Sequence, residues 1–201
     1  MEYASGGDLA DFLKKSRKQG PLEQMRVVKI VEQVLSGLEH VHGKKLLHRD
    51  IKPANVLLSA EGDAKLADFG VSRVLSNSLS QARTMIGTPY YLSPEMIEDK
   101  GYSFPSDIWS TGVLVYEMLT YSHPFQGANL PQVIMSIMRG NPRPLPSRYC
   151  ADLQNLVENM MKVDPAHRLS ASACLALPVF SEARADEDSM GSTMPATRNP
   201  C

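Results

Sequence analysis

HRDIKPAN, at residues 48–55, is the stretch that decides the fold, and the tripeptide DFG follows it at residues 68–70. Between them, the runs NVLLS and AKLAD flank AEGD, whose residue types are typical of a tight turn. This pattern predicts a short β-hairpin. Because a hairpin brings its two ends together, we expect Asp50, which precedes it, to lie close to Asp68, which follows it.

Acidic and amide side chains would therefore meet at the open end of this hairpin, because Asn55 joins the two acids from the same side. An aspartate and an asparagine that converge can hold a hard cation such as Mg2+ through their oxygen atoms. A second aspartate that stays free of metal can orient a hydroxyl group and accept its proton. Lys52 adds a fixed positive charge where the charge of a phosphate group would develop.

The spacing H-R-D-x-x-x-x-N followed by D-F-G is far more specific than either motif alone, and with it the sequence resembles the C-terminal lobe of a eukaryotic protein kinase. HRDIKPAN looks like the catalytic loop and DFG like the magnesium loop. GTPYYLSPE at residues 87–95 looks like the loop that docks the substrate, and SDIWSTG at residues 106–112 looks like the start of the central buried helix. Arg168 matches the arginine that pairs with the glutamate of the docking loop, here Glu95.

The resemblance implies a role for each matching residue. Asp50 would orient the hydroxyl group of the substrate and accept its proton, and Lys52 would steady the transferring phosphoryl group. Asn55 and Asp68 would hold Mg2+, and Thr88 would help to dock the substrate. The residues with an implied structural role are His48, Phe69, Glu95, Asp107 and Arg168.

The opening stretch MEYASGGDL looks like the hinge between the two lobes of a kinase, which implies where ATP binds. Met1 would guard the back of the adenine pocket. The backbone at Glu2 and Ala4 would meet the adenine, and Asp8 would reach the ribose. The implied ATP-binding residues are Met1, Glu2, Ala4, Asp8, Lys52, Asn55, Leu57 and Asp68.

The type of substrate is implied by a few further positions. Lys52 and Thr88 match the pattern of serine/threonine kinases, and GTPYYLSPE is most similar to the NIMA-related (Nek) kinases. The implied activity is transfer of the γ-phosphate of ATP to Ser or Thr hydroxyl groups of protein substrates, with ATP and Mg2+ as cofactors. Two alternatives stay open: a non-catalytic scaffold or binding module, and a Mg2+-dependent phosphohydrolase that uses Asp50 and Asp68.

Regulation is implied by Arg49, whose charge beside Asp50 would need a partner once it is buried. Thr84 lies three residues before Gly87, where members of the family carry an activating phosphate. We expect a phosphate on Thr84, added by an upstream kinase or by autophosphorylation, to pair with Arg49 and Arg73 and to order the loop. Alternatively, Thr84 is a solvated loop residue.

Helical periodicity dominates the rest of the chain. Apolar residues recur at steps of three and four over residues 27–41, and residues 107–121 are apolar nearly all round, which predicts an amphipathic helix and a buried one. We expect a mainly α (α+β) fold, a kinase-like C-terminal lobe over residues 1–181 with the short hairpin at its cleft. Residues 182–201 lack periodic apolar positions, so we expect a disordered tail there.

Composition restricts the partners and the setting. The formal net charge of the chain is −1 and no apolar run is long enough to span a bilayer, so we expect neither a nucleic-acid nor a membrane partner. The three cysteines lie far apart and form no CxxC pair. We therefore expect neither a zinc site nor disulfides, and an intracellular, cytoplasmic setting.

Two parts of a complete kinase have no counterpart in these 201 residues. No G-x-G-x-x-G loop precedes the hinge-like stretch, and there is no V-A-I-K-like lysine to anchor the phosphates of ATP. We therefore expect a fragment that lacks the β-rich N-terminal lobe and that transfers phosphate at a negligible rate by itself.

Overall fold

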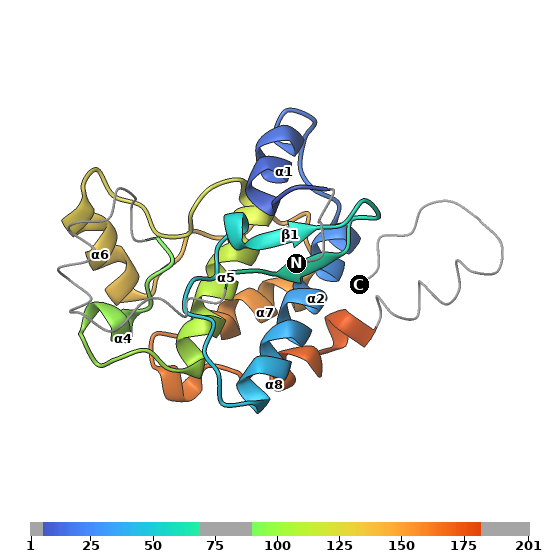
Figure 1. Ribbon diagram of the computed structural model, residues 1–201. Helices are drawn as coiled ribbons and strands as arrows, with labels where there is room; N and C mark the ends of the chain where they lie inside the picture. Colours follow the sequence, from blue (N-terminus) through green and yellow to red (C-terminus); the bar gives the residue numbers. More distant parts are fainter. Residues whose placement is uncertain (1–5, 69–89, 182–201) are drawn as a thin grey trace.

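The structure is a computed structural model that describes residues 6–68 and 90–181 (Figure 1). Several predicted site residues lie outside the described residues: Met1, Glu2, Ala4, Phe69, Arg73, Thr84 and Thr88. The predicted tail, residues 182–201, lies outside them too.

The described residues are mainly helical, as predicted. The helices are α1 (Leu9–Ser16), α2 (Gln24–Gly43), α4 (Pro94–Ile97), α5 (Phe104–Thr120), α6 (Leu130–Arg139), α7 (Ala151–Met160) and α8 (Ala171–Leu175). Two 3-10 turns, η1 (Pro53–Asn55) and η2 (Pro165–His167), join them, and strands β1 (Val56–Leu58) and β2 (Ala64–Leu66) form an antiparallel pair. The predicted hairpin is therefore confirmed.

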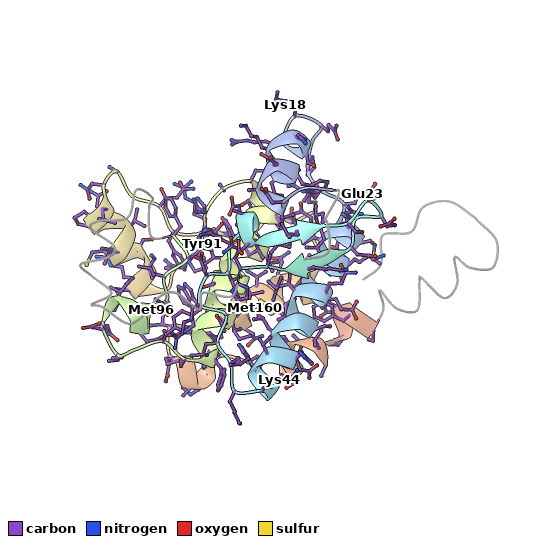
Figure 2. All side chains as sticks on the ribbon, in the orientation of Figure 1. Lys18, Glu23, Lys44, Tyr91, Met96 and Met160 are labelled. Carbon is purple, nitrogen blue, oxygen red and sulfur yellow. The ribbon has the colours of Figure 1, made fainter. Side chains whose placement is uncertain are left out.

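Helix α5 runs through the middle of the molecule and packs against α2 and α7 (Figure 1). Residues 106–116 of α5 are all buried, which agrees with their nearly uniform apolar character. Gly112 permits the close approach of α7, because a Cβ atom at this position would lie 2.8 Å from the Cβ atom of Met160. Side chains fill the spaces between these helices (Figure 2), so α5 is a rigid base for the loops around it.

Helix α2 connects this core to the hairpin. Its apolar face, over residues 27–41, is buried. Near the middle of the helix, Gln33 donates a hydrogen bond to Asp63 Oδ1 at 3.0 Å and accepts one from the backbone N–H of Ala64 at 2.6 Å. These two bonds fix the turn of the hairpin on α2, so the site residues at its other end have a fixed position too.

Gly6 and Gly7 carry the chain along the edge of the hairpin. The backbone N–H of Gly6 donates to the carbonyl of Leu58 at 3.0 Å, and Leu58 N–H donates to the carbonyl of Gly7 at 2.8 Å. A Cβ atom at Gly6 would lie 2.4 Å from the carbonyl oxygen of Ser59, and Gly7 has a φ of +77°. Only glycine fits both requirements without strain, so this stretch is specified by the hairpin that it touches.

No helix in residues 6–68 and 90–181 combines the length and the apolar character that crossing a membrane requires. Cys174 is buried and free, as a small core residue would be. Cys150 is disulfide-bonded, so the expectation of a chain without disulfides is wrong at this position. Separation along the sequence does not limit which residues meet in the folded chain.

Candidate active site

The carboxylate of Asp50 is the centre of the site. Lys52 Nζ lies 2.7 Å from Asp50 Oδ2, and Asn55 Nδ2 donates both to Asp50 Oδ2 at 2.9 Å and to the carbonyl of Asp50 at 2.7 Å. The side chain of Asp50 remains 25% exposed. The carboxylate is therefore held in one orientation and can still be reached from solvent.

Local sequence places these three side chains together. Lys52 is extended, and Pro53 then begins the 3-10 turn η1. The fixed φ of proline suits a first helical position. The turn is closed by a hydrogen bond from the N–H of Asn55 to the carbonyl of Lys52 at 3.0 Å. As a result, the chain folds back on itself within five residues, and the side chains of Lys52 and Asn55 both reach Asp50.

Asp68 reaches the same end of the hairpin through Ala67. The N–H of Ala67 donates to the carbonyl of Asn55 at 2.9 Å, and its carbonyl lies 3.1 Å from Nε2 of His48. Burial lowers the pKa of His48, while the carboxylates of Asp107, Asp50 and Asp68 act to raise it. Because Ala67 contacts both Asn55 and His48, the next residue, Asp68, begins at the same end of the hairpin as Asp50.

A buried carboxylate, Asp107 of α5, holds the backbone of the catalytic loop. Its two oxygens accept hydrogen bonds from the backbone N–H groups of His48 and Arg49, each at 3.0 Å. His42 Nε2 lies 2.8 Å from Oδ2, and the hydroxyl of Tyr102 donates to Oδ1. Burial alone would raise the pKa of Asp107, but these hydrogen bonds outweigh it and lower the pKa.

The structure agrees with the structural role that the sequence implied for Asp107, but His42 and Tyr102 were not predicted. His42 lies in the last turn of α2 and Tyr102 lies just before α5. The only signal in the sequence was the position of a histidine six residues before the HRD motif. Such a position does not predict a partner 65 residues further along the chain.

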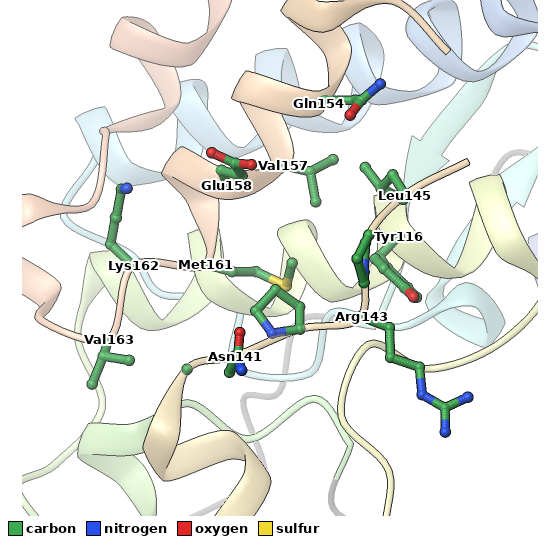
Figure 3. Close-up of a pocket in the computed structure, with 13 residues that line it drawn as sticks. Tyr116, Asn141, Arg143, Leu145, Gln154, Val157, Glu158, Met161, Lys162 and Val163 are labelled. Atoms are coloured by element: carbon green, nitrogen blue, oxygen red, sulfur yellow. The ribbon is translucent and has the colours of Figure 1, made fainter. Parts of the chain in front are cut away.

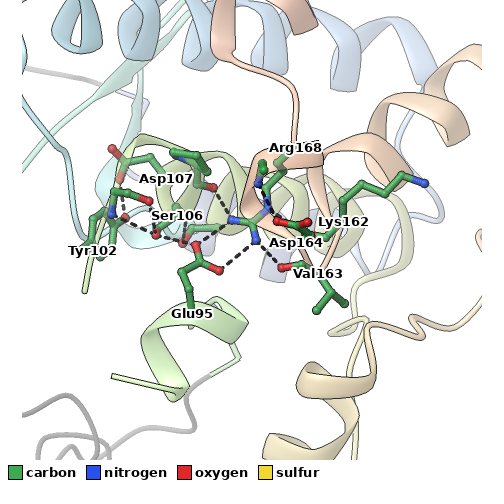
Figure 4. A network of polar contacts seen from close by, with 12 residues as sticks. Glu95, Tyr102, Ser106, Asp107, Lys162, Val163, Asp164 and Arg168 are labelled. Carbon is green, nitrogen blue, oxygen red and sulfur yellow. Dashed lines mark hydrogen bonds and ion pairs between the residues drawn. The ribbon is translucent and has the colours of Figure 1, made fainter. Parts of the chain in front are cut away.

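A second buried acid, Glu95 of α4, pairs with Arg168 as predicted (Figure 4). Arg168 donates from Nη1 to Glu95 Oε1 at 2.8 Å and from Nη2 to Oε2 at 3.0 Å, a bidentate geometry. Ser106 Oγ adds a bond of 2.7 Å to Oε1. Burial opposes ionisation of Glu95, but Arg168 and Ser106 outweigh it and lower the pKa. The pair joins the end of the docking loop to the start of α5 and to η2.

A family model described as a protein kinase domain matches residues 1–180. The chain belongs to the protein kinase family. Its relatives include the probable serine/threonine-protein kinase nek3 of Dictyostelium discoideum, 41% identical over 90% of this chain and 17% of that protein. Serine/threonine-protein kinase Nek5 of Homo sapiens is 43% identical over 89% of this chain and 25% of that protein. Serine/threonine-protein kinase Nek2 of Mus musculus is 38% identical over 93% of this chain and 44% of that protein.

These relatives confirm the similarity of this kinase chain to the NIMA-related serine/threonine kinases. The chain spans less than half of the length of each of the three proteins, from 17% to 44%. Comparison therefore establishes the family over the matched residues.

Two of the residues expected to bind ATP are neighbours in this chain. Asp8 and Leu57 form an isolated antiparallel bridge at the edge of the hairpin. Asp8 also caps helix α1, because its Oδ1 accepts a hydrogen bond from the N–H of Asp11 at 2.8 Å. Asp8 thus has a capping role that the sequence analysis did not predict.

Arg49 has the properties of a charge in need of a partner. Its Nε atom is buried and has no hydrogen-bond partner in residues 6–68 and 90–181. Its backbone has a φ of 70°, in the left-handed region, where Asp68 also lies with a φ of 52°. Each such residue costs about 1–3 kcal/mol and persists only where its surroundings enforce it. Thr84, whose phosphate is the expected partner of Arg49, lies outside the described residues, as does Arg73, which is expected to pair with the same phosphate.

A cavity of about 480 Å³ lies elsewhere in this chain, between α5, α7 and the segment after α6 (Figure 3). Its lining includes Tyr116, Leu145, Val157 and Met161. None of the predicted site residues lines it, so the cavity is separate from the candidate active site.

Proposed function

We propose that this chain carries the catalytic loop of a serine/threonine protein kinase that transfers the γ-phosphate of ATP to Ser or Thr hydroxyl groups of protein substrates. We further propose that the described residues correspond to the C-terminal lobe of that domain. The observation that carries the proposal is the carboxylate of Asp50, oriented by Lys52 and Asn55 and still open to solvent. Membership of the protein kinase family supports it.

In this proposal Asp50 accepts the proton of the substrate hydroxyl. A general base must lie within hydrogen-bond reach of that proton and must be held in place, and the bonds from Lys52 and Asn55 hold it. Lys52 carries a positive charge 2.7 Å from Asp50, so the same charge would face a phosphoryl group placed beside the hydroxyl.

The side chains of Asn55 and Asp68 fit a hard cation. Both amide hydrogens of Asn55 are used in bonds to Asp50, which leaves Oδ1 as the oxygen that can face a cation. Asp68 is exposed and adds a carboxylate at the same end of the hairpin. Within the described residues no group of three or more His, Cys, Asp or Glu side chains forms a metal site. We propose that Asn55 and Asp68 hold Mg2+, which when bound neutralises charge on the phosphates of ATP.

For ATP itself we propose the edge of the hairpin where Asp8 pairs with Leu57. The adenine would lie against the hinge-like residues Met1, Glu2 and Ala4. We also propose that residues 1–201 transfer phosphate far more slowly on their own than typical kinases do, which turn over about 1–100 times per second. The reason is that this sequence contains neither a G-x-G-x-x-G loop nor a V-A-I-K-type lysine to hold the phosphates.

The test is phosphoryl transfer from ATP to a protein substrate with Asp50→Asn in the full-length protein. Loss of the base should lower kcat by about 10²–10⁴, while Glu158→Gln, a change at an exposed residue of α7, should leave it unaltered. Transfer at the wild-type rate by Asp50→Asn would contradict the proposal. Absence of transfer by the wild type would favour the scaffold, and phosphate release without a labelled protein would favour the phosphohydrolase.

A further inference from the structure

Two consecutive tyrosines of the docking loop, Tyr90 and Tyr91, contact one histidine that follows α5, His123. The rings of Tyr90 and His123 are stacked, with centroids 3.8 Å apart and an angle of 18° between their planes. Tyr91 meets the same imidazole ring edge-on, with centroids 5.9 Å apart and planes at 80°. The side chain of His123 thus contacts both tyrosines, which follow the expected docking residue Thr88 and Pro89 in the sequence.

Helix α5 holds Tyr91 at two further points. The hydroxyl of Tyr91 donates a hydrogen bond to Oε2 of Glu117, and the carbonyl of Tyr91 accepts one from Ser110 Oγ at 2.9 Å. Tyr91 is therefore fixed to α5 by polar bonds. For the side chain of Tyr90, the interaction with the described residues, in addition to apolar packing, is the stack on His123. The start of the described docking loop thus depends on this imidazole ring.

The imidazole of His123 is partly buried, with 28% of its side chain exposed. Its Nδ1 atom is buried and has no hydrogen-bond partner in the described part of the chain. The carboxylate of Glu117 of α5 has Oε2 at 3.8 Å from Nδ1, which is too long for a hydrogen bond. Among the residues that the structure describes, the titratable side chains in contact with the ring are those of Glu117, Tyr90 and Tyr91.

Burial lowers the pKa of His123 below its ordinary value of 6.5, although Glu117 acts to raise it. The ring is therefore neutral at pH 7. Burial raises the pKa of Tyr91, so this hydroxyl keeps the proton that it donates to Glu117. A group whose pKa is lowered by packing stabilises the packed arrangement fully above its ordinary pKa, and that contribution is lost as the pH falls through the lowered value.

We propose that His123 is a positioning residue for the protein substrate: its ring holds the docking loop against the end of α5 through Tyr90, and protonation of the ring loosens the loop. This inference rests on the proposed kinase function. Because His123 acts through Tyr90, it changes how well the loop receives a substrate and leaves the chemistry at Asp50 unaltered.

The kinetic test compares His123→Ala with His123→Phe in the full-length protein, using a peptide substrate at pH 7.5. An aromatic pair of this kind corresponds to about a two- to tenfold change in affinity, so His123→Ala should raise the peptide KM by that factor with kcat and the KM for ATP unaltered. His123→Phe keeps a ring and should retain the wild-type KM. His167→Ala, at a histidine with 78% of its side chain exposed, is the matched control.

The pH profile separates this role from simple packing. The peptide KM of the wild type should rise between pH 7.5 and pH 5.5, whereas that of His123→Phe should change by less than about twofold, since phenylalanine has no proton to gain. A fall in kcat equal to the loss in kcat/KM for His123→Ala, or identical pH profiles for wild type and His123→Phe, would overturn the role of His123.

A measurement without activity checks the stack itself. In residues 1–201, the NMR titration of His123 should move toward pH 6.5 in Tyr90→Ala, because the ring becomes more exposed, and should stay in place in Tyr90→Phe. An unaltered midpoint in Tyr90→Ala would overturn the stack. Absence of any transfer by the full-length protein would instead overturn the proposed function, and with it the role of His123 toward a substrate.

Discussion

Oδ1 of Asp107 accepts a hydrogen bond from the backbone N–H of Arg49 at 3.0 Å, although 58 residues separate the two. Arg49 has a φ of 70°, which costs about 1–3 kcal/mol for a residue with a side chain. The neighbouring N–H of His48 donates to the other oxygen of the same carboxylate. A buried acid on the central helix therefore holds the strained backbone immediately before Asp50.

Asp107→Asn should destabilise the chain strongly. An amide has one acceptor oxygen, whereas both oxygens of Asp107 accept hydrogen bonds, so at least one buried donor would be left without a partner. We expect the free energy of unfolding to fall by about 2–4 kcal/mol, measured by chemical denaturation. In the full-length protein, kcat should fall as well, because the backbone at Arg49 is released. A loss below about 0.5 kcal/mol would show that Asp107 does not hold the loop.

His42→Ala should have a smaller effect of the same kind. His42 supplies one of the hydrogen bonds to Asp107, at 2.8 Å, and a hydrogen bond to a charged group contributes about 1.5–3 kcal/mol. His40→Ala is the matched control, because His40 lies in the same turn of α2 and is exposed. Equal denaturation midpoints for the two variants would exclude a supporting role for His42.

At acidic pH, the stability of the chain should depend on the ion pair between Glu95 and Arg168. The pKa of Glu95 is lowered in the folded chain, so its stabilising contribution is present above the ordinary value of 4.5 and is lost as the pH falls through the lowered value. Glu95→Gln should therefore show a flatter loss of stability than the wild type between pH 5 and pH 3. At pH 7 the same change should cost about 3–5 kcal/mol, because it leaves the charge of Arg168 buried without its partner.

A double variant tests that explanation of the cost. Replacing both residues, as Glu95→Leu with Arg168→Leu, removes the uncompensated charge and should recover part of the stability lost in Arg168→Leu alone. Strictly additive losses in chemical denaturation would show that the two residues contribute independently.

Gly112→Ala should destabilise the packing of α5 on α7. The added Cβ atom would lie 2.8 Å from the Cβ atom of Met160, and overpacking of this kind costs about 1–3 kcal/mol. Gly43→Ala, at the end of α2, meets no atom within 4 Å and should leave stability unaltered or raise it by up to about 1 kcal/mol. Thermal unfolding of the two variants would distinguish them, and equal midpoints would contradict close packing at Gly112.

Thr84→Ala should lower the activity of the full-length protein if phosphate on Thr84 is the partner of Arg49, whose Nε atom has no hydrogen-bond partner in residues 6–68 and 90–181. Phosphatase treatment should reduce wild-type activity to the level of the variant and should leave the variant itself unaltered. Equal rates for wild type and Thr84→Ala before treatment would instead favour a solvated loop residue without a regulatory role.

The sequence by itself determined the parts that depend on neighbouring residues. The turn residues AEGD predict the hairpin, the nearly uniform apolar character of residues 107–121 predicts a buried helix, and the H-R-D-x-x-x-x-N spacing brings Lys52 and Asn55 to Asp50. These features are set by backbone geometry over a few residues, which composition and spacing encode directly. The pairing of Glu95 with Arg168 was available only through resemblance to the kinase family.

Only the tertiary structure decided which distant side chains complete these local features. His42 and Tyr102 meet Asp107 because α2 ends beside the first turns of α5, and His123 stacks on Tyr90 because the docking loop returns to the end of α5. Such contacts depend on how helices pack, and no periodicity within one segment specifies a partner in another. The chemistry of the site is therefore encoded locally, whereas its positioning follows from the packing around the central helix.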